Sequence, residues 1–252
     1  MLQQTPVSRV LPAYEAWLHR WPTPAALAAD SRGEAVRMWG RLGYPRRALR
    51  LHESAVAIVE QHGGQVPPDV TDLLALPGIG AYTARAVAAF GFGQRQAVVD
   101  TNVRRVAGRL VAGEGRLTPS AAGDLALVEP LLPEEPATAA RLSVALMELG
   151  ALVCTARSPL CPACPVAARC AWRRAGYPAP DVPPEPAQTY AGTDRQVRGL
   201  LLGVVRAADR PVPAAALDAV WSDDAQRIRA LEALVTDGLI HPLQNGTYAL
   251  PF

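Results

Sequence analysis

The four cysteines of this 252-residue chain lie within seventeen residues of one another, in the spacing C-x6-C-x2-C-x5-C. They are Cys154, Cys161, Cys164 and Cys170. Thiolates this close in sequence can converge on one metal site, and three prolines in the segment bend the loop around it. The first chemistry that the sequence indicates is therefore metal ligation by sulfur.

Three kinds of site compete for these cysteines. A disulfide pair is disfavoured, because the sequence has no other cysteine and no secretory leader. Four-cysteine zinc sites usually carry two C-x2-C knuckles, whereas this chain has one. Four thiolates equally suit a 4Fe-4S cluster, and cluster spacings vary between families. Spacing alone leaves zinc and the cluster as equal alternatives.

A glycine-containing turn, LPGIGAYTARAVAAF at residues 76–90, opens into a helix predicted to begin near Ala81. The missing Cβ atoms of Gly78 and Gly80 allow a ligand to approach the backbone closely. Backbone N–H groups at such a turn and helix start form an anion site that can hold a DNA phosphate without reading sequence. An ordinary corner between two helices is the alternative interpretation.

Asp100 stands ten residues after this helix and directly before another helix, in AVVDTNVRRVAGRL at residues 97–110. Its simplest role is to cap the N-terminus of that helix. A carboxylate at a helix start is stabilised as an anion, which also suits a catalytic group in a pocket.

Composition limits the function classes. A chain of 252 residues, half of them apolar, can bury a sizeable core, and this length predicts one large domain plus a small one. Only 19 % of the residues are charged, which disfavours a disordered tail protein. No run of eighteen apolar residues and no basic-then-apolar leader occur, so we expect a cytoplasmic protein without a membrane span. All 25 basic residues are Arg, which excludes a Lys Schiff base. Residues 1–174 hold 19 Arg and 14 acids, a mildly basic balance that is compatible with nucleic acid.

The apolar periodicity predicts a mainly α protein. Residues 1–175 show apolar side chains at steps of three and four and no alternation, which indicates short helices without a sheet. A Pro-rich linker is expected over residues 176–189, followed by a winged-helix-like module over residues 190–252. The module should contain helices at 194–208, 213–220 and 225–237, then strands 239–243 and 248–250 joined by a type I′ turn at Asn245-Gly246.

The hairpin LPGIGAYT, the Asp of VVDTNVRRV and the cysteine loop, in this order, resemble the endonuclease III-like helix–hairpin–helix DNA glycosylase superfamily. Within it the chain is most similar to the A/G-specific adenine glycosylases of the MutY type. The matching segments are MLQQTPVSRV at 1–10, WGRLGYPRRALRLH at 39–52 and ALMELGALVCT at 145–155. The resemblance covers residues 1 to about 175.

This resemblance implies a two-lobed helix–hairpin–helix glycosylase fold with an iron–sulfur loop at 154–170. One lobe holds the hairpin, and the other lobe carries the cluster and is built from the two chain ends. The resemblance implies a 4Fe-4S cofactor held by the four cysteines. The partner would be double-stranded DNA with a mismatched or damaged base pair, whose target base flips into a pocket. The protein would act as a monomer on the nucleoid of a bacterial cell.

The resemblance also implies residue roles. Asp100 would stabilise the oxocarbenium-like sugar as adenine departs, in parallel with the carboxylates of glycoside hydrolysis. Tyr82 stands where strand-cleaving relatives carry Lys, so the reaction should stop at base removal, and Tyr82 and Asn102 would orient the aspartate. The DNA-contacting residues would be Leu2, Gln3 and Gln4 in the pocket and the helix, Tyr44 beside the damaged guanine, and Gly78, Ile79 and Gly80 on a phosphate. Plain core packing is the alternative for Leu2 and Tyr44.

Three departures from the family accompany these roles. Family members carry a catalytic Glu two residues before the Met of MLQQT, and the sequence begins at that Met, so we expect a start placed downstream of the natural one or an impaired enzyme. Val144 stands where the family often has Gln or Glu against adenine. Residues 190–252 are too short for the MutT-like domain that checks 8-oxoguanine in many members, and they lack its acidic box.

The function expected first is a monofunctional glycosylase that removes adenine mispaired with 8-oxoguanine or guanine. A thymine or uracil mismatch glycosylase of the same superfamily, which also has Tyr at the Lys position, is the second expectation. A non-catalytic iron–sulfur DNA-binding protein is the third. The MLQQT and ALMELGALVCT segments favour adenine.

Overall fold

The computed structural model describes residues 1–2, 5–179 and 190–252, which form two compact units. Unit 1 comprises Met1–Pro67, Leu76–Gly78 and Ala187–Phe252, and unit 2 comprises Pro68–Ala75 and Ile79–Pro186. The predicted pocket residues Gln3 and Gln4 and most of the predicted linker lie outside the described residues. No helix among the described residues is long and apolar enough to cross a membrane.

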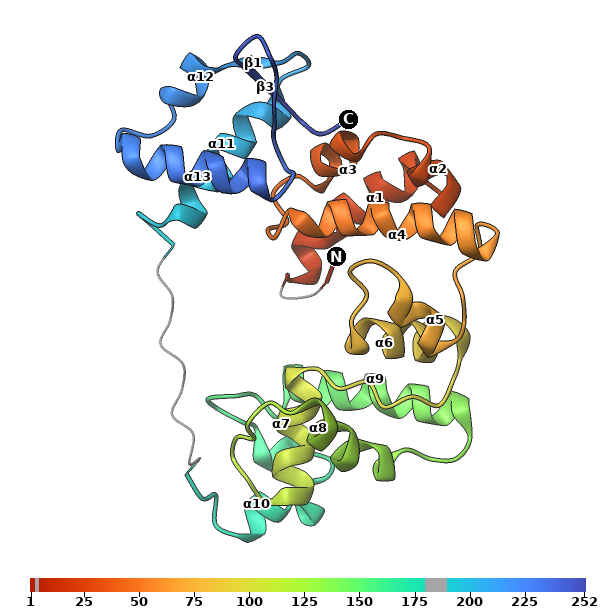
Figure 1. Ribbon diagram of the computed structural model, residues 1–252. Coiled ribbons are helices and arrows are strands. Elements are labelled where there is room, and N and C mark those ends of the chain that lie inside the picture. The colour runs from red at the N-terminus through yellow and green to blue at the C-terminus, as the bar shows by residue number, and fades with distance from the viewer. Residues whose placement is uncertain (3–4, 180–189) are drawn as a thin grey trace. The chain divides into compact units, whose positions relative to one another are not determined.

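Unit 1 combines helices from the two ends of the chain (Figure 1). Its elements are α1 (Val7–Arg20), α2 (Pro24–Ala28), α3 (Arg32–Trp39), α4 (Arg46–His62), α11 (Asp194–Ala207), β1 (Val212–Pro213), α12 (Ala214–Asp218), α13 (Asp224–Thr236), β2 (His241–Pro242) and β3 (Thr247–Ala249). One apolar core runs from Trp17, Trp21 and Trp39 to Leu201, Leu234 and Ile240. The C-terminal segment therefore shares its core with the first helices of the chain.

Close contacts confirm this shared core. The Cβ of an alanine at Gly33 of α3 would clash with the carbonyl oxygen of Pro251, so only glycine fits between the helix and residues 250–251. Trp17 packs edge-to-face on Trp21 and on Trp39, with ring centroids 4.6 and 5.9 Å apart. Such edge-to-face pairs stabilise the core beyond what the burial of the indole rings contributes.

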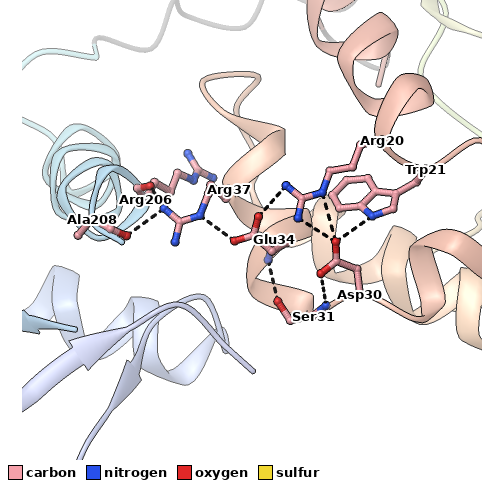
Figure 2. Close-up of polar contacts among 8 residues, drawn as sticks. All are labelled: Arg20, Trp21, Asp30, Ser31, Glu34, Arg37, Arg206 and Ala208. Atoms are coloured by element: carbon pink, nitrogen blue, oxygen red, sulfur yellow. Dashed lines mark hydrogen bonds and ion pairs between the residues drawn. The ribbon is translucent and has the colours of Figure 1, made fainter. Parts of the chain in front are cut away.

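Polar contacts also join α3 to the end of α11 (Figure 2). Arg37 donates to the backbone carbonyls of Arg206 and Ala208, which lie where α11 ends and its carbonyls lack helical partners. Glu34 accepts from Arg37 at 2.9 Å and pairs with Arg20 at 2.8 Å. The C-terminus of α11 is thus capped by the side chain of Arg37, which comes from the N-terminal region.

The C-terminal segment contains the three expected helices, and its small sheet differs in two ways from the prediction. Strand β1, at Val212–Pro213, was not predicted; it pairs with β3, which also pairs with β2, giving the antiparallel order β1-β3-β2. The type I′ turn is wrong, because only Gly246 of the Asn245-Gly246 pair has a positive φ. The Gly246 N–H donates to the carbonyl of Leu243, which makes a three-residue loop ending in a left-handed glycine.

The described part of unit 2 contains helices and loops but no strand, as the periodicity predicts. Its elements are α5 (Val70–Ala75), α6 (Ala81–Phe92), α7 (Thr101–Ala107), a π-helical turn (Gly108–Ala112), α8 (Ala121–Val128), a 3-10 turn (Glu129–Leu131), α9 (Pro136–Leu152), 3-10 turns at Cys161–Ala163 and Ala167–Arg169, and α10 (Ala171–Arg174). The core packs α7 against α9 through residues such as Val103, Val106 and Leu146.

The grouping of segments differs from the one that the resemblance implies. The cysteine loop belongs to the same unit as α6 and α7, and the N-terminal residues cluster with residues 187–252 instead of with the loop. The reason is the shared core of unit 1, in which Val36 and Leu49 pack with Val197 and Leu239.

Candidate active site and cysteine loop

Asp100 is the N-cap of α7, and its two carboxylate oxygens accept hydrogen bonds from different groups. Its Oδ1 accepts from the backbone N–H groups of Asn102 and Val103 at 2.8 and 2.7 Å. Its Oδ2 accepts only from the side-chain amide of Asn102, at 3.1 Å, among the hydrogen bonds of the described residues. The capping role and a catalytic role are therefore compatible, because one oxygen fixes the carboxylate and the other keeps acceptor capacity for a cation.

Tyr82, in the first turn of α6, shares the electrostatic environment of Asp100. Burial raises the pKa of the Tyr82 hydroxyl, and the negative charge of Asp100 adds to that increase. The phenol therefore keeps its proton at neutral pH and can serve as a hydrogen-bond donor. The structure thus brings together Asp100, Asn102 and Tyr82, the three residues for which catalytic roles are expected.

Arg105 holds the Asn102 amide in one orientation. Its Nη2 donates to the Oδ1 of Asn102 at 2.7 Å and to the carbonyl of Gly150 at 2.6 Å, and its Nε donates to the carbonyl of Cys154 at 2.7 Å. The Asn102 amide nitrogen must then face Asp100. No local pattern in the sequence indicates this role of Arg105, because two of its partners lie 45 and 49 residues away.

Gly150 is a second residue that sequence reasoning missed. A Cβ added at this position of α9 would lie 2.7 Å from the Cβ of Asn102 and 2.9 Å from its carbonyl oxygen. The glycine lets α9 approach α7 at the point where Asn102 turns toward Asp100.

We predict that Gly150→Ala lowers the free energy of unfolding by roughly 1–3 kcal/mol, because backbone and side chain of Asn102 must move to admit the methyl group. Gly203→Ala in α11 is the matched control: nothing lies within 4 Å of its added Cβ, so we expect a gain of about 0.4–1 kcal/mol. Denaturant titration of both variants measures the difference, and equal stabilities would contradict the close approach at Gly150.

The hairpin between α5 and α6 has the expected turn. Gly78 has φ +76°, a left-handed conformation, and a Cβ there would lie 2.5 Å from the Cβ of Arg50. The Ser54 hydroxyl fixes the turn by donating to the carbonyl of Pro77 at 2.6 Å. Gly80 precedes α6 and has no side chain to cap the first N–H groups of that helix, while Ile79 is half-buried beside it.

Leu2 and Tyr44 both belong to unit 1 and are exposed, with 58 % and 56 % of their surface accessible. Core packing, the alternative interpretation of both side chains, does not fit this exposure. Tyr44 has φ +47°, which is unusual for a bulky residue and costs roughly 1–3 kcal/mol. Val144, which replaces the family's polar residue, is also exposed on α9.

The four cysteines line one pocket of unit 2, together with Arg109, Trp172 and Arg173. All four are free thiols, so the structure contradicts a disulfide. Four cysteines around one pocket supply one thiolate for each iron of a 4Fe-4S cluster, so this set of donors fits that cofactor.

Arg109 provides the positive charge that a thiolate site requires. Its Nη1 lies 3.4 Å from the sulfur of Cys154 and donates to the carbonyl of Thr155 at 2.8 Å, and its Nη2 donates to the carbonyl of Ala156 at 3.1 Å. Its guanidinium carbon lies 4.5 Å over the ring of Trp172. The π-helical turn Gly108–Ala112 carries Arg109, and no pattern in the sequence predicts that turn.

Comparisons with known proteins agree with this geometry. Residues 1–126 match the family described as HhH-GPD superfamily base excision DNA repair protein, and residues 154–170 match the iron-sulfur binding domain of endonuclease III. An adenine DNA glycosylase of Mycobacterium tuberculosis is 56 % identical over 100 % of this chain and 83 % of its own length. An adenine DNA glycosylase of Homo sapiens is 41 % identical over 69 % of this chain and 32 % of its own length.

Solved structures show the same relationship. A thermostable thymine-DNA glycosylase matches with a TM-score of 0.62 and 28 % identity, over 69 % of this chain and 80 % of that chain. A non-covalent endonuclease III–DNA complex matches with a TM-score of 0.60 and 25 % identity, over 69 % and 79 %. The chain belongs to the HhH-GPD superfamily of base excision DNA repair proteins and, within it, to the adenine DNA glycosylases. It binds DNA, and its cofactor is a 4Fe-4S cluster.

Proposed function

We propose that this protein hydrolyses the N-glycosidic bond of adenine that is mispaired with 8-oxoguanine or guanine in double-stranded DNA. The observation that carries the proposal is the Asp100 carboxylate, fixed by α7 through one oxygen while the other stays open to a cation. As the bond to adenine breaks, the base leaves with a proton from a general acid, which in the family that this chain resembles is a Glu two residues before the Met of MLQQT. Positive charge develops at the anomeric carbon of the sugar, and water then adds to that carbon. A preorganised carboxylate facing that carbon stabilises the charge where it arises.

Tyr82 and Asn102 orient this carboxylate. Asn102 donates to Oδ2 and is itself held by Arg105, so Oδ2 keeps one direction during the reaction. Tyr82 remains protonated beside Asp100 and contributes a neutral donor instead of a second negative charge. This division leaves Asp100 as the only anion of the three residues.

The DNA contacts are proposed on other elements. Leu2, Gln3 and Gln4 would line the base pocket and enter the helix, and the exposed Tyr44 would stack beside the base opposite adenine. The backbone at Gly78, Ile79 and Gly80 would hold a phosphate and so position the duplex without reading its sequence. These residues fall in the glycosylase domain that we assign to residues 1–175. The protein would act as a monomer on the bacterial nucleoid.

The four cysteines of residues 154–170 are the proposed cluster ligands, because they line the same pocket as Arg109. When bound, the cluster links four points of the loop through iron–thiolate bonds and so contributes to the stability of the fold. Arg109 then offsets part of the negative charge of the thiolates.

We predict that base removal is not followed by strand scission. An amine nucleophile at the sugar is needed for β-elimination, and the chain contains no Lys. The reaction should leave an intact strand with an abasic site until alkali is added, as a denaturing gel will show. Borohydride trapping of a covalent adduct through a side chain would contradict this prediction; an N-terminally acetylated sample controls for the terminal amine.

A thymine or uracil mismatch glycosylase is the second candidate, which the likeness to a thymine-DNA glycosylase favours. Single-turnover assays on four duplexes separate the two: adenine opposite 8-oxoguanine, adenine opposite guanine, guanine opposite thymine, and guanine opposite uracil. We expect cleavage only at the adenines. Excision of thymine or uracil without adenine would support the second candidate, and DNA binding without excision of any base would refute both.

A further inference from the structure

The loop from Gly40 to Pro45, between α3 and α4, holds Tyr44 in an unfavourable backbone conformation. Gly40, Gly43 and Tyr44 have φ values of 56°, 81° and 47°. Glycine adopts such angles readily, but for a tyrosine they are strained and persist only where surrounding contacts determine them. The contacts that hold this loop therefore decide where the Tyr44 ring stands.

Four consecutive carbonyls of this loop each accept a hydrogen bond from a side chain. The donors are Arg206 to Gly40, Arg9 to Arg41 at 2.8 Å, Thr5 to Leu42 at 3.3 Å, and Trp39 to Gly43 at 2.9 Å. They come from α1 and the residues before it, from α3 and from α11. A loop whose carbonyls are all taken by protein donors has few alternative conformations.

The C-terminal segment, residues 190–252, holds both ends of the loop. At the first end, Arg206 of α11 donates to the carbonyl of Gly40. Arg37 of α3 donates in return to the carbonyls of Arg206 and Ala208, as Figure 2 shows. At the second end, Asp237, which follows α13, pairs with Arg46 at 3.2 Å and is itself bonded to Arg198. The two contacts lie on either side of Tyr44.

Arg206 makes this contact under conditions that are unfavourable for a cation. Its Nε and Nη2 are buried and have no hydrogen-bond partner among the residues that the structure describes, and burial lowers its pKa to about 10. Burying a guanidinium without a carboxylate partner lowers the stability of a fold. A residue kept at such a cost is a candidate for a functional role. The contact that it makes is the one to Gly40.

The segment is poorly suited to bind DNA through its third helix. Asp223, Asp224 and Glu232 are exposed on or beside α13. Its exposed Arg229 is paired with Asp194 at 2.9 Å. Phosphates are repelled by such an acidic face, so a DNA-reading role of α13 does not account for the segment.

We propose that the C-terminal segment positions the Tyr44 loop: Arg206 and Asp237 hold the loop so that Tyr44 enters DNA beside the base opposite adenine, which sets the preference for 8-oxoguanine over guanine at that place. Arg206 and Asp237 are thus positioning residues, and the effect on base preference rests on the proposed function.

Hydrogen exchange of peptides covering residues 40–47 tests the positioning by itself, in the full chain. Arg206→Met keeps the apolar stem but removes the donor to Gly40, and Asp237→Asn weakens the pair with Arg46. Arg229→Met is the matched control, since it removes an Arg and an ion pair from α13 without touching the loop. We expect exchange about tenfold faster or more in the first two variants only, as for the loss of one charge-assisted hydrogen bond. Loop exchange equal to that of Arg229→Met in both variants would overturn the proposal.

Base preference tests the functional consequence. The ratio of single-turnover rates for adenine opposite 8-oxoguanine and opposite guanine should fall severalfold in Arg206→Met and in Tyr44→Ala. It should fall no further in the double variant, because Arg206 acts through Tyr44. Additive losses, or an unchanged ratio in Arg206→Met despite faster loop exchange, would refute this part. If the wild-type protein excises no adenine, the proposed function fails, and the exchange experiment still decides whether the segment holds the loop.

Discussion

Asp100→Asn is expected to slow the single-turnover release of adenine by a factor of about 10²–10³ or more, with DNA affinity changed only severalfold. Asparagine caps a helix about as well as aspartate, so α7 and the fold should be preserved. What the variant loses is the negative charge that we propose faces the anomeric carbon. The measurement is a rapid-quench time course with enzyme in excess over the duplex of adenine opposite 8-oxoguanine.

The control for this variant is Asp223→Asn, which makes the same change at another helix N-cap. Asp223 caps α13 by accepting from the backbone N–H of Gln226 at 3.0 Å. Its variant should release adenine at the wild-type rate. A small loss in Asp100→Asn, or a similar loss in both variants, would show that Asp100 is a structural cap only.

Cys161→Ala is expected to abolish cluster binding. All four cysteines line one pocket, and a cluster that loses one of four thiolates is no longer held, so the loop between Cys154 and Cys170 should unfold with it. Wild-type protein should be brown, with broad visible absorption and about four iron and four sulfide per chain. The variant should be colourless and less stable to heat.

Arg169→Gln serves as the control for the cysteine variant, because Arg169 is exposed in the same loop and carries no sulfur. It should retain iron, sulfide and colour. A wild-type preparation with one zinc per chain and no iron or sulfide would contradict the cluster assignment.

The sequence predicts most local elements of this fold correctly because their signals are local. Helix α6 begins at Ala81 as expected, directly after the glycine-containing turn that ends at Gly80. Asp100 caps α7 because its carboxylate reaches the N–H groups two and three residues later. Spacing within seventeen residues also suffices to bring four cysteines to one pocket. In each case the interacting groups are close in sequence.

The features that the sequence does not predict depend on residues far apart in the chain. Arg105 orients the Asn102 amide while it is held by carbonyls 45 and 49 residues away, and Arg206 reaches Gly40 across 166 residues. The short strand β1 exists only because β3 lies beside it. Tertiary packing, absent from any local pattern, decides these cases.

The most direct test of the central claim is to identify the base that is released. The full chain is incubated with a duplex that carries isotope-labelled adenine opposite 8-oxoguanine, and the small-molecule fraction is analysed by liquid chromatography and mass spectrometry. The account predicts free labelled adenine in an amount equal to the abasic sites formed, and none with Asp100→Asn. No labelled adenine from the wild-type protein, or equal amounts from the wild-type protein and Asp100→Asn, would contradict it.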